Sequence, residues 1–150
     1  MKKLTTVAVI ALSAIMASPM VMACEEHDNG HTTHQATSNT GKTVTVKFAK
    51  GASAANYSGQ IKGTKYDTYT FTAKKGQKLK VKATGGNVDT YLFGANITDS
   101  VNVGQYSPAL DNNGAYTLPA TGTYQLRVLQ PRSQANQGKQ PKYNLQIAIR

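Results

Sequence analysis

The 150-residue chain has a single cysteine, no tryptophan and only seven acidic residues against 17 lysines and arginines, which gives a formal net charge of +10. One cysteine excludes an internal disulfide, so a folded domain must be stabilised by its apolar core. A single domain of this length can bury roughly two-thirds of its surface, and one domain is expected. The basic balance favours an acidic partner or surface, although net charge bears on association and not on fold.

Groups that carry out catalysis are scarce in the body of the chain, beyond residue 41. All histidines and both glutamates precede this point, so only Asp67, Asp89, Asp99 and Asp111 remain as acidic residues. Without histidine or cysteine there is no nucleophile–base pair, and scattered aspartates do not make a metal site. The pair Gly85-Gly86 precedes a strand pattern and not a helix, which excludes a phosphate-binding loop. The sequence therefore predicts no enzyme, no cofactor and no metal in this body.

Residues 1–23 have the pattern of a secretion signal. Lys2 and Lys3 form a positive start, residues 7–17 are an apolar stretch too short to span a membrane, and residues 21–23 form a small-residue cleavage site. Removing this segment takes two lysines away and leaves a formal charge of +8. We therefore expect an exported protein whose folded part contains none of these residues.

Cys24 follows the expected cleavage site directly, and Val-Met-Ala-Cys resembles a bacterial lipobox. In the preferred interpretation Cys24 is lipidated and anchors a lipoprotein at the outer membrane. Lipidation would explain an unpaired cysteine in an oxidising compartment. The alternative is ordinary cleavage at the same bond, which would release a soluble periplasmic protein.

Residues 24–41 are polar and have few apolar side chains, a composition typical of a flexible tether. His27, His31 and His34 lie here at the spacing of a loose metal-binding tract. No second cysteine supports such a site, so a spacer with incidental histidines is the preferred interpretation.

From residue 42 to residue 150 apolar and polar residues alternate with a period of two, which predicts strands. No window has a helical period, although the connection 94–113 has room for small helical turns. About seven or eight short strands separated by turns predict a single-domain, all-β antiparallel β-sandwich. The clearest strands lie at residues 43–48, 68–73, 78–83, 88–93, 124–128 and 143–149. Among the inward positions we expect Tyr69, Phe71, Leu126, Val128, Leu145 and Ile147 to be buried.

The stretch from Tyr116 to Arg132 combines a strand with a polar loop. A turn ending at Gly122 precedes the strand, and Pro131 ends it because proline has no N–H for the ladder. The loop that follows, residues 132–142, contains no large apolar residue. A rigid strand with such a loop is one way to build a binding edge. The pattern alone favours an ordinary core strand and a solvated loop.

The segment from Ala73 to Lys82 carries five lysines. They would suit a groove for an anionic polymer, but lysines on the outer face of a strand also prevent edge-to-edge aggregation. No aromatic residue is interleaved on that face, so a base-stacking platform is not supported and no nucleic acid is expected as a partner. The solvated face is the preferred interpretation.

Five sequence blocks resemble the periplasmic inhibitors of goose-type (g-type) lysozyme, the PliG family. They are YSGQIKG at 57–63, YDTYTFTAKKGQKLKV at 66–81, DTYLFG at 89–94, YSPALD at 106–111 and YTLPATGTYQLRVLQPR at 116–132. A more distant likeness, to the prepeptidase C-terminal modules of secreted proteases, supports the fold only. The closer resemblance implies an inhibitor that blocks the active-site groove of a host g-type lysozyme with a protruding loop.

The resemblance also implies binding residues. The family's Ser-Gly-x-Tyr motif reads Thr121-Gly122-Thr123-Tyr124 here, and threonine keeps the hydroxyl. Arg132 matches the first loop arginine of the family. Asn136 stands where a second arginine can occur, and Thr64 stands at an aromatic position. An arginine fork suits a cleft whose catalytic groups are carboxylates.

Two functions from different classes remain open at this stage. One is a lysozyme inhibitor, in which Arg132 and the turn at Thr121 would be presented together. The other is a non-inhibitory accessory module of the cell envelope that binds glycan or an envelope protein. Glycan binders usually stack sugars on exposed aromatic rings, and the lack of tryptophan favours the inhibitor.

Overall fold

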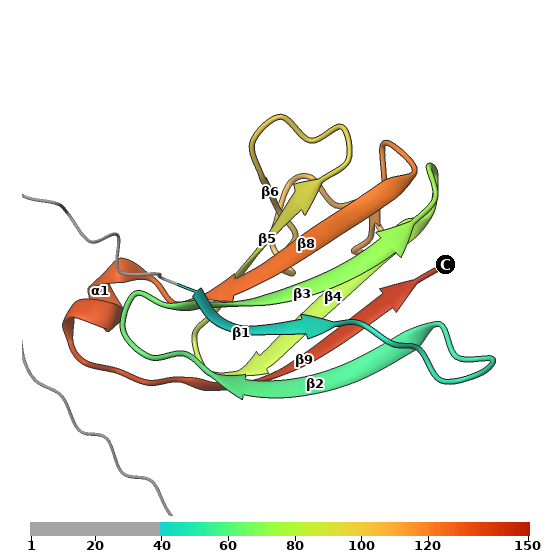
Figure 1. Cartoon of the computed structure of the whole chain (residues 1–150). Helices are drawn as coiled ribbons and strands as arrows, with labels where there is room; N and C mark the ends of the chain where they lie inside the picture. Colours follow the sequence, from blue (N-terminus) through green and yellow to red (C-terminus); the bar gives the residue numbers. More distant parts are fainter. Residues whose placement is uncertain (1–39) are drawn as a thin grey trace, which may run out of the picture. The chain divides into compact units, whose positions relative to one another are not determined.

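The computed structural model describes residues 40–150, drawn in colour in Figure 1. The expected signal peptide, Cys24 and the three histidines lie outside the described residues. The described part contains nine strands and one short helix, arranged as two sheets. The expectation of an all-β sandwich is confirmed. No helix in residues 40–150 is long and apolar enough to cross a membrane.

The first sheet has five strands and the second has four (Figure 1). Their neighbours are antiparallel except for β1 and β3, which are parallel. In spatial order the first sheet comprises β1 (Thr40–Thr45), β3 (Tyr66–Ala73), β8 (Gly122–Leu129), β5 (Asp89–Gly94) and β6 (Val101–Asn102). The second comprises β2 (Ala54–Gln60), β9 (Lys142–Ile149), β4 (Lys78–Gly85) and β7 (Tyr116–Thr117). The helix α1 (Arg132–Asn136) lies between β8 and β9 in the chain.

Alternation along the central strands places their apolar residues in one core. In β8 every second residue from Tyr124 to Val128 is buried, and β9 repeats the pattern from Tyr143 to Ile147. Removing this apolar surface from water is the main stabilising contribution, since the chain has no disulfide. All six residues expected in the core are buried: Tyr69, Phe71, Leu126, Val128, Leu145 and Ile147.

A buried polar link joins the two sheets. The Tyr143 hydroxyl of β9 donates to Asp67 Oδ2 of β3 at 2.5 Å and lies 2.8 Å from the Tyr69 hydroxyl. The Lys42 amide donates to Asp67 Oδ1 at 2.9 Å, which also attaches β1. Burial, together with the bond to Asp67, raises the pKa of the Tyr143 phenol far above its usual value. Tyr143 therefore remains a donor, and the carboxylate is satisfied within the core.

Four local expectations from the sequence were incomplete. The strand β2 was missed because AANYSGQ has little apolar character, and its pairing with β9 overrides that weak propensity. The segment 46–48 lies outside β1, which begins earlier and pairs in parallel. Arg132–Asn136 forms a helical turn where only a loop was expected. The connection 94–113 contains the short strand β6 and no helix.

Candidate functional site

Two connections meet at one end of the sandwich, and Gln130 holds them together. Gln130 follows β8, is buried, and its Nε2 donates to Gly63 O at 2.8 Å and to Lys139 O at 3.0 Å. It thereby joins the β2–β3 connection to the β8–β9 connection. We call these two segments, residues 61–65 and 130–141, the α1 end. α1 lies at this extremity in Figure 1.

Local sequence explains why a helical turn begins at the α1 end. Pro131 has φ −54° and ψ 141°, so it ends the strand, and its carbonyl accepts from the amides of Gln134 and Ala135 at 3.0 and 3.1 Å. Gly138 has φ +68°, which turns the chain back toward β9. No residue of α1 is buried, so the helix holds its side chains outside the core.

The α1 end is positively charged. Lys62, Lys65, Arg132 and Lys139 are all exposed in its two segments, and neither segment contains an acidic residue. The only ion pair in residues 40–150 joins Lys78 to Asp111, so the Arg132 guanidinium is not neutralised by its own domain. A shallow cavity of about 260 Å³ adjoins this end and is lined by Lys42, Lys62, Lys65 and buried Asp67, among others. These features favour a ligand or partner that presents carboxylates.

Three of the residues implied by the family resemblance gather at the α1 end. Arg132 begins α1 and Asn136 ends it, and both are exposed. Thr64, also exposed, follows Gly63, whose carbonyl is bound by Gln130. Gly63 has φ +58°, a conformation that glycine adopts without strain. The structure therefore presents Thr64 on one connection and Arg132 and Asn136 on the helix of the other, and Gln130 joins the two connections.

The other three implied residues lie at the opposite end of β8. Thr121 Oγ1 accepts from the Lys75 amide at 3.0 Å and thus fixes the β3–β4 turn. A Cβ on Gly122 would lie 2.8 Å from Ala95 Cβ, so glycine permits a close approach of the chain. The eight residues of β8 separate Gly122 from the α1 end by about 25 Å. Thr121 and Arg132 are therefore not presented together, contrary to the expectation for a single binding edge.

Tyr124 belongs to the core. It has no exposed surface, its ring stacks on Phe71 with centroids 5.7 Å apart, and its hydroxyl donates to Ala120 O at 2.5 Å. This bond fastens the turn before β8 to the strand itself. A direct contact of the Tyr124 side chain with a partner does not fit this geometry; its role is to position the turn.

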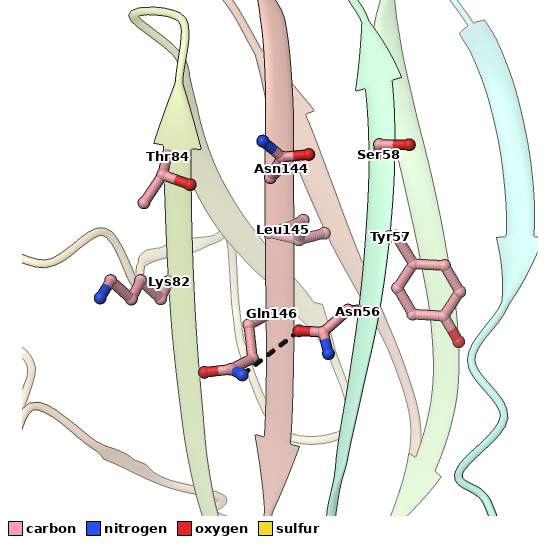
Figure 2. Close-up of a pocket in the computed structure, with 8 residues that line it drawn as sticks. All are labelled: Asn56, Tyr57, Ser58, Lys82, Thr84, Asn144, Leu145 and Gln146. Carbon is pink, nitrogen blue, oxygen red and sulfur yellow. Dashed lines mark hydrogen bonds between the residues drawn. The ribbon is translucent and has the colours of Figure 1, made fainter.

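A second polar surface lies on the outer face of the β2–β9–β4 sheet. Figure 2 shows Asn144 and Gln146 of β9 between Lys82 and Thr84 on one side and Asn56 and Ser58 on the other. Gln146 Nε2 donates to Asn56 Oδ1 at 3.2 Å. Sequence reasoning singled out only the lysines of this surface. The alternation along β9 places Asn144 and Gln146 on the same outer face, so the sequence could have indicated these two side chains. The neighbouring strand β2 was not predicted from the sequence.

The architecture defines the class of the protein as a small β-sandwich domain with exposed loops at both ends. In agreement, the family model described as "Bacterial pre-peptidase C-terminal domain" matches residues 65–130.

The particular family follows from more extensive matches. The chain is 57% identical over 110 residues to a protein of Escherichia coli (strain K12) named "Inhibitor of g-type lysozyme", covering 73% of this chain and 83% of that protein. The structure is similar to a mutant of the Escherichia coli periplasmic inhibitor PliG-Ec (TM-score 0.72, 55% identity, 73% of this chain and 99% of the other). It is equally similar to Salmonella Typhimurium PliG (TM-score 0.72, 54% identity, the same shares). The chain belongs to the PliG family of inhibitors of g-type lysozyme.

Proposed function

We propose that this protein is a periplasmic inhibitor of g-type lysozyme and that it binds the enzyme through the α1 end. The observation that carries the first part is the 57% identity over 110 residues to the Escherichia coli inhibitor. The solved relatives are likewise periplasmic inhibitors of this enzyme class. The protein is thus a binding protein that acts on an enzyme and is not itself an enzyme.

The chemistry of the target supports the choice of the α1 end. Glycoside hydrolases hold catalytic carboxylates in a cleft, and a planar guanidinium can bind a carboxylate through two parallel hydrogen bonds. Arg132 is exposed, lies on a short helical turn and has no acidic neighbour in the two segments of the α1 end. Once water is excluded by binding, such a charge-assisted contact strengthens. Arg132 inserted into the groove would block access of the glycan substrate.

The other implied residues have separate roles in this proposal. Thr64 and Asn136 flank Arg132 and contact the rim of the lysozyme groove. The opposite end of the sandwich is stabilised by Thr121, Gly122 and Tyr124. These residues affect lysozyme binding only indirectly, because they hold β8 in position. The loop-in-groove mechanism therefore rests on three residues at one end.

One experiment tests the function. The full chain, expressed with its own signal sequence and purified after export, is added to g-type and hen-type lysozyme, and clearing of a cell-wall suspension is followed. We expect inhibition of the g-type enzyme and little effect on the hen-type enzyme. Clearing of g-type samples at the uninhibited rate would reject the inhibitor and favour the non-inhibitory envelope module.

We further propose that Cys24, which lies outside the described residues, anchors the protein to the outer membrane by a lipid. The lipobox-like sequence before Cys24 supports this. Cys24→Ala should move the protein from the membrane fraction to the soluble periplasm. The measurement is immunoblotting of fractionated cells, with Ser38→Ala as a control variant. Identical fractionation of Cys24→Ala and wild type would reject the lipid anchor at Cys24.

A further inference from the structure

The outer face of the second sheet has a row of open hollows along β9. Three successive hollows of about 550, 500 and 560 Å³ follow this strand from its first residue to its last. Asn144 lines the first and second hollows, and Gln146 lines the second and third, so neighbouring hollows adjoin along the strand. We call this row of hollows the β9 groove. Since β9 has eight residues, the groove is about 26 Å long, enough for an extended polymer chain.

Amides and hydroxyls dominate the middle of the groove, whereas Ala54, Ala115 and Ala148 border the third hollow. Asn56 and Ser58 of β2, Asn144 and Gln146 of β9 and Thr84 of β4 are all exposed in the middle hollow (Figure 2). The apolar residues that also border the middle hollow have their side chains in the core: Leu145 is 1% exposed, and the Tyr57 ring packs 5.1 Å from that of Tyr69. The floor thus offers hydrogen-bond donors and acceptors in rows, which suits a polyhydroxylated chain.

Positive charge lines one side of the groove. Lys80 and Lys82 project from β4 toward solvent, and within residues 40–150 neither ammonium group has a hydrogen bond or an ion pair. Lys142 borders the first hollow and Arg150 the third. The one acidic residue, Asp111, is bound by Lys78 at 2.9 Å, and this bond lowers the pKa of its carboxyl. Asp111 therefore neutralises Lys78 and leaves the other cations available.

We propose that the β9 groove binds a linear anionic polysaccharide. The length of the groove, its hydrogen-bonding floor and its unpaired lysines fit a chain of sugars that carry carboxylates. A single-stranded nucleic acid fits less well, because no aromatic ring faces the groove to stack on bases. A membrane surface fits less well too, because this face carries mostly polar and charged side chains, and its apolar ones, such as Ala54 and Ala148, are small. This site is separate from the α1 end and does not depend on lysozyme inhibition.

The test uses the exported full chain and a defined probe, a fluorescently labelled oligogalacturonate, with hexa-N-acetylchitohexaose as the neutral counterpart. We expect oligogalacturonate to bind with an affinity that falls as salt is raised, and the neutral hexamer to bind much more weakly. Lys80→Gln with Lys82→Gln should weaken binding about tenfold, because two of the charges that meet the polymer are lost. The matched control, Lys47→Gln with Lys50→Gln, removes the same charge from the β1–β2 connection and should bind as wild type.

Nuclear magnetic resonance of the wild type adds a readout that needs no mutation. Amide shifts on titration with oligogalacturonate should concentrate in β2, β9 and β4. The proposal would be overturned if amide shifts spread over the whole surface, or if the two double lysine variants weakened binding equally. Either result would mean that binding depends only on the net charge of the protein. Failure of oligogalacturonate to bind, or tighter groove binding of an oligothymidylate, would also overturn the proposal. No lysozyme is present in these assays, so their outcome is independent of the inhibitor function.

Discussion

At the scale of single residues, Arg132 is the side chain on which inhibition should depend most. Arg132→Ala should weaken inhibition of g-type lysozyme, since loss of a desolvated charge partner typically costs about 2–5 kcal/mol of binding free energy. The unfolding temperature should hardly change, because Arg132 is exposed and packs against no core residue. Lysine at this position should restore inhibition only partly, because an ammonium lacks the planar fork.

The control for Arg132 is Arg150→Ala. Arg150 is also an exposed arginine, but it lies after β9, at the end of the sandwich away from α1. The inhibition constants of the two variants should therefore differ strongly although their charges are equal. Equal constants for Arg132→Ala and wild type would remove Arg132 from the interface.

Substitution of Tyr124 should lower stability without affecting inhibition, the reverse of the result expected for Arg132. Tyr124→Phe removes the hydroxyl that contacts both the carbonyl and the amide of Ala120, which should lower the free energy of unfolding by about 0.5–1.5 kcal/mol. Inhibition at 25 °C should remain unchanged, since the ring is buried in the core. Thermal unfolding and inhibition assays on one preparation measure both quantities. A loss of inhibition with an unchanged unfolding temperature would mean that Tyr124 contacts the enzyme itself.

At the scale of elements, the α1 end depends on Gln130, the buried amide that bonds to both connections. Gln130→Ala would leave the Gly63 and Lys139 carbonyls without these partners, at a cost of about 1–3 kcal/mol of stability. The amides of residues 63–65 should exchange faster with solvent, and inhibition should weaken because Thr64 and Arg132 lose their fixed spacing. Gln125→Ala, an exposed glutamine on the same β8, is the matched control. Unchanged amide exchange in Gln130→Ala would show that the two connections hold their positions independently.

The elements also show what a sequence can and cannot reveal. Strands such as β8 and β9 were predictable because apolar residues alternate there, and alternation alone assigned Leu126 and Ile147 to the core. Edge strands such as β2 were not, because their stability comes from a neighbour distant in the chain. The residues of the candidate site were indicated by family resemblance. Their division between the two ends of β8 could have been predicted, because the turn at Gly122 and Pro131 already delimit that strand in the sequence; the approach of Thr64 to Arg132, which depends on the tertiary contacts of Gln130, could not.

At the scale of the whole molecule, stability rests on one core. Leu126 is completely buried at the centre of β8, and Leu126→Ala should cost about 2–5 kcal/mol, partly through the cavity that remains. That is a large share of the stability of a typical domain, and no disulfide limits the unfolded chain. Urea unfolding followed by circular dichroism measures the loss, with Leu129→Ala at a partly exposed position of the same strand as the control. An unfolding midpoint equal to wild type would contradict the assignment of this strand face to the core.

The position of β9 has a consequence for how the protein reaches its folded state. β9 is the last strand of the chain, yet it lies between β2 and β4, and β2 pairs with no other strand of the second sheet. Until residues 142–149 are available for pairing, β2 has no partner in its sheet and β4 has only the two residues of β7. Contacts between such distant segments form slowly, because a long loop must close first. Completion of the second sheet therefore depends on β9, so a chain in which β9 is absent or blocked should leave β2 and β4 unpaired and the core exposed.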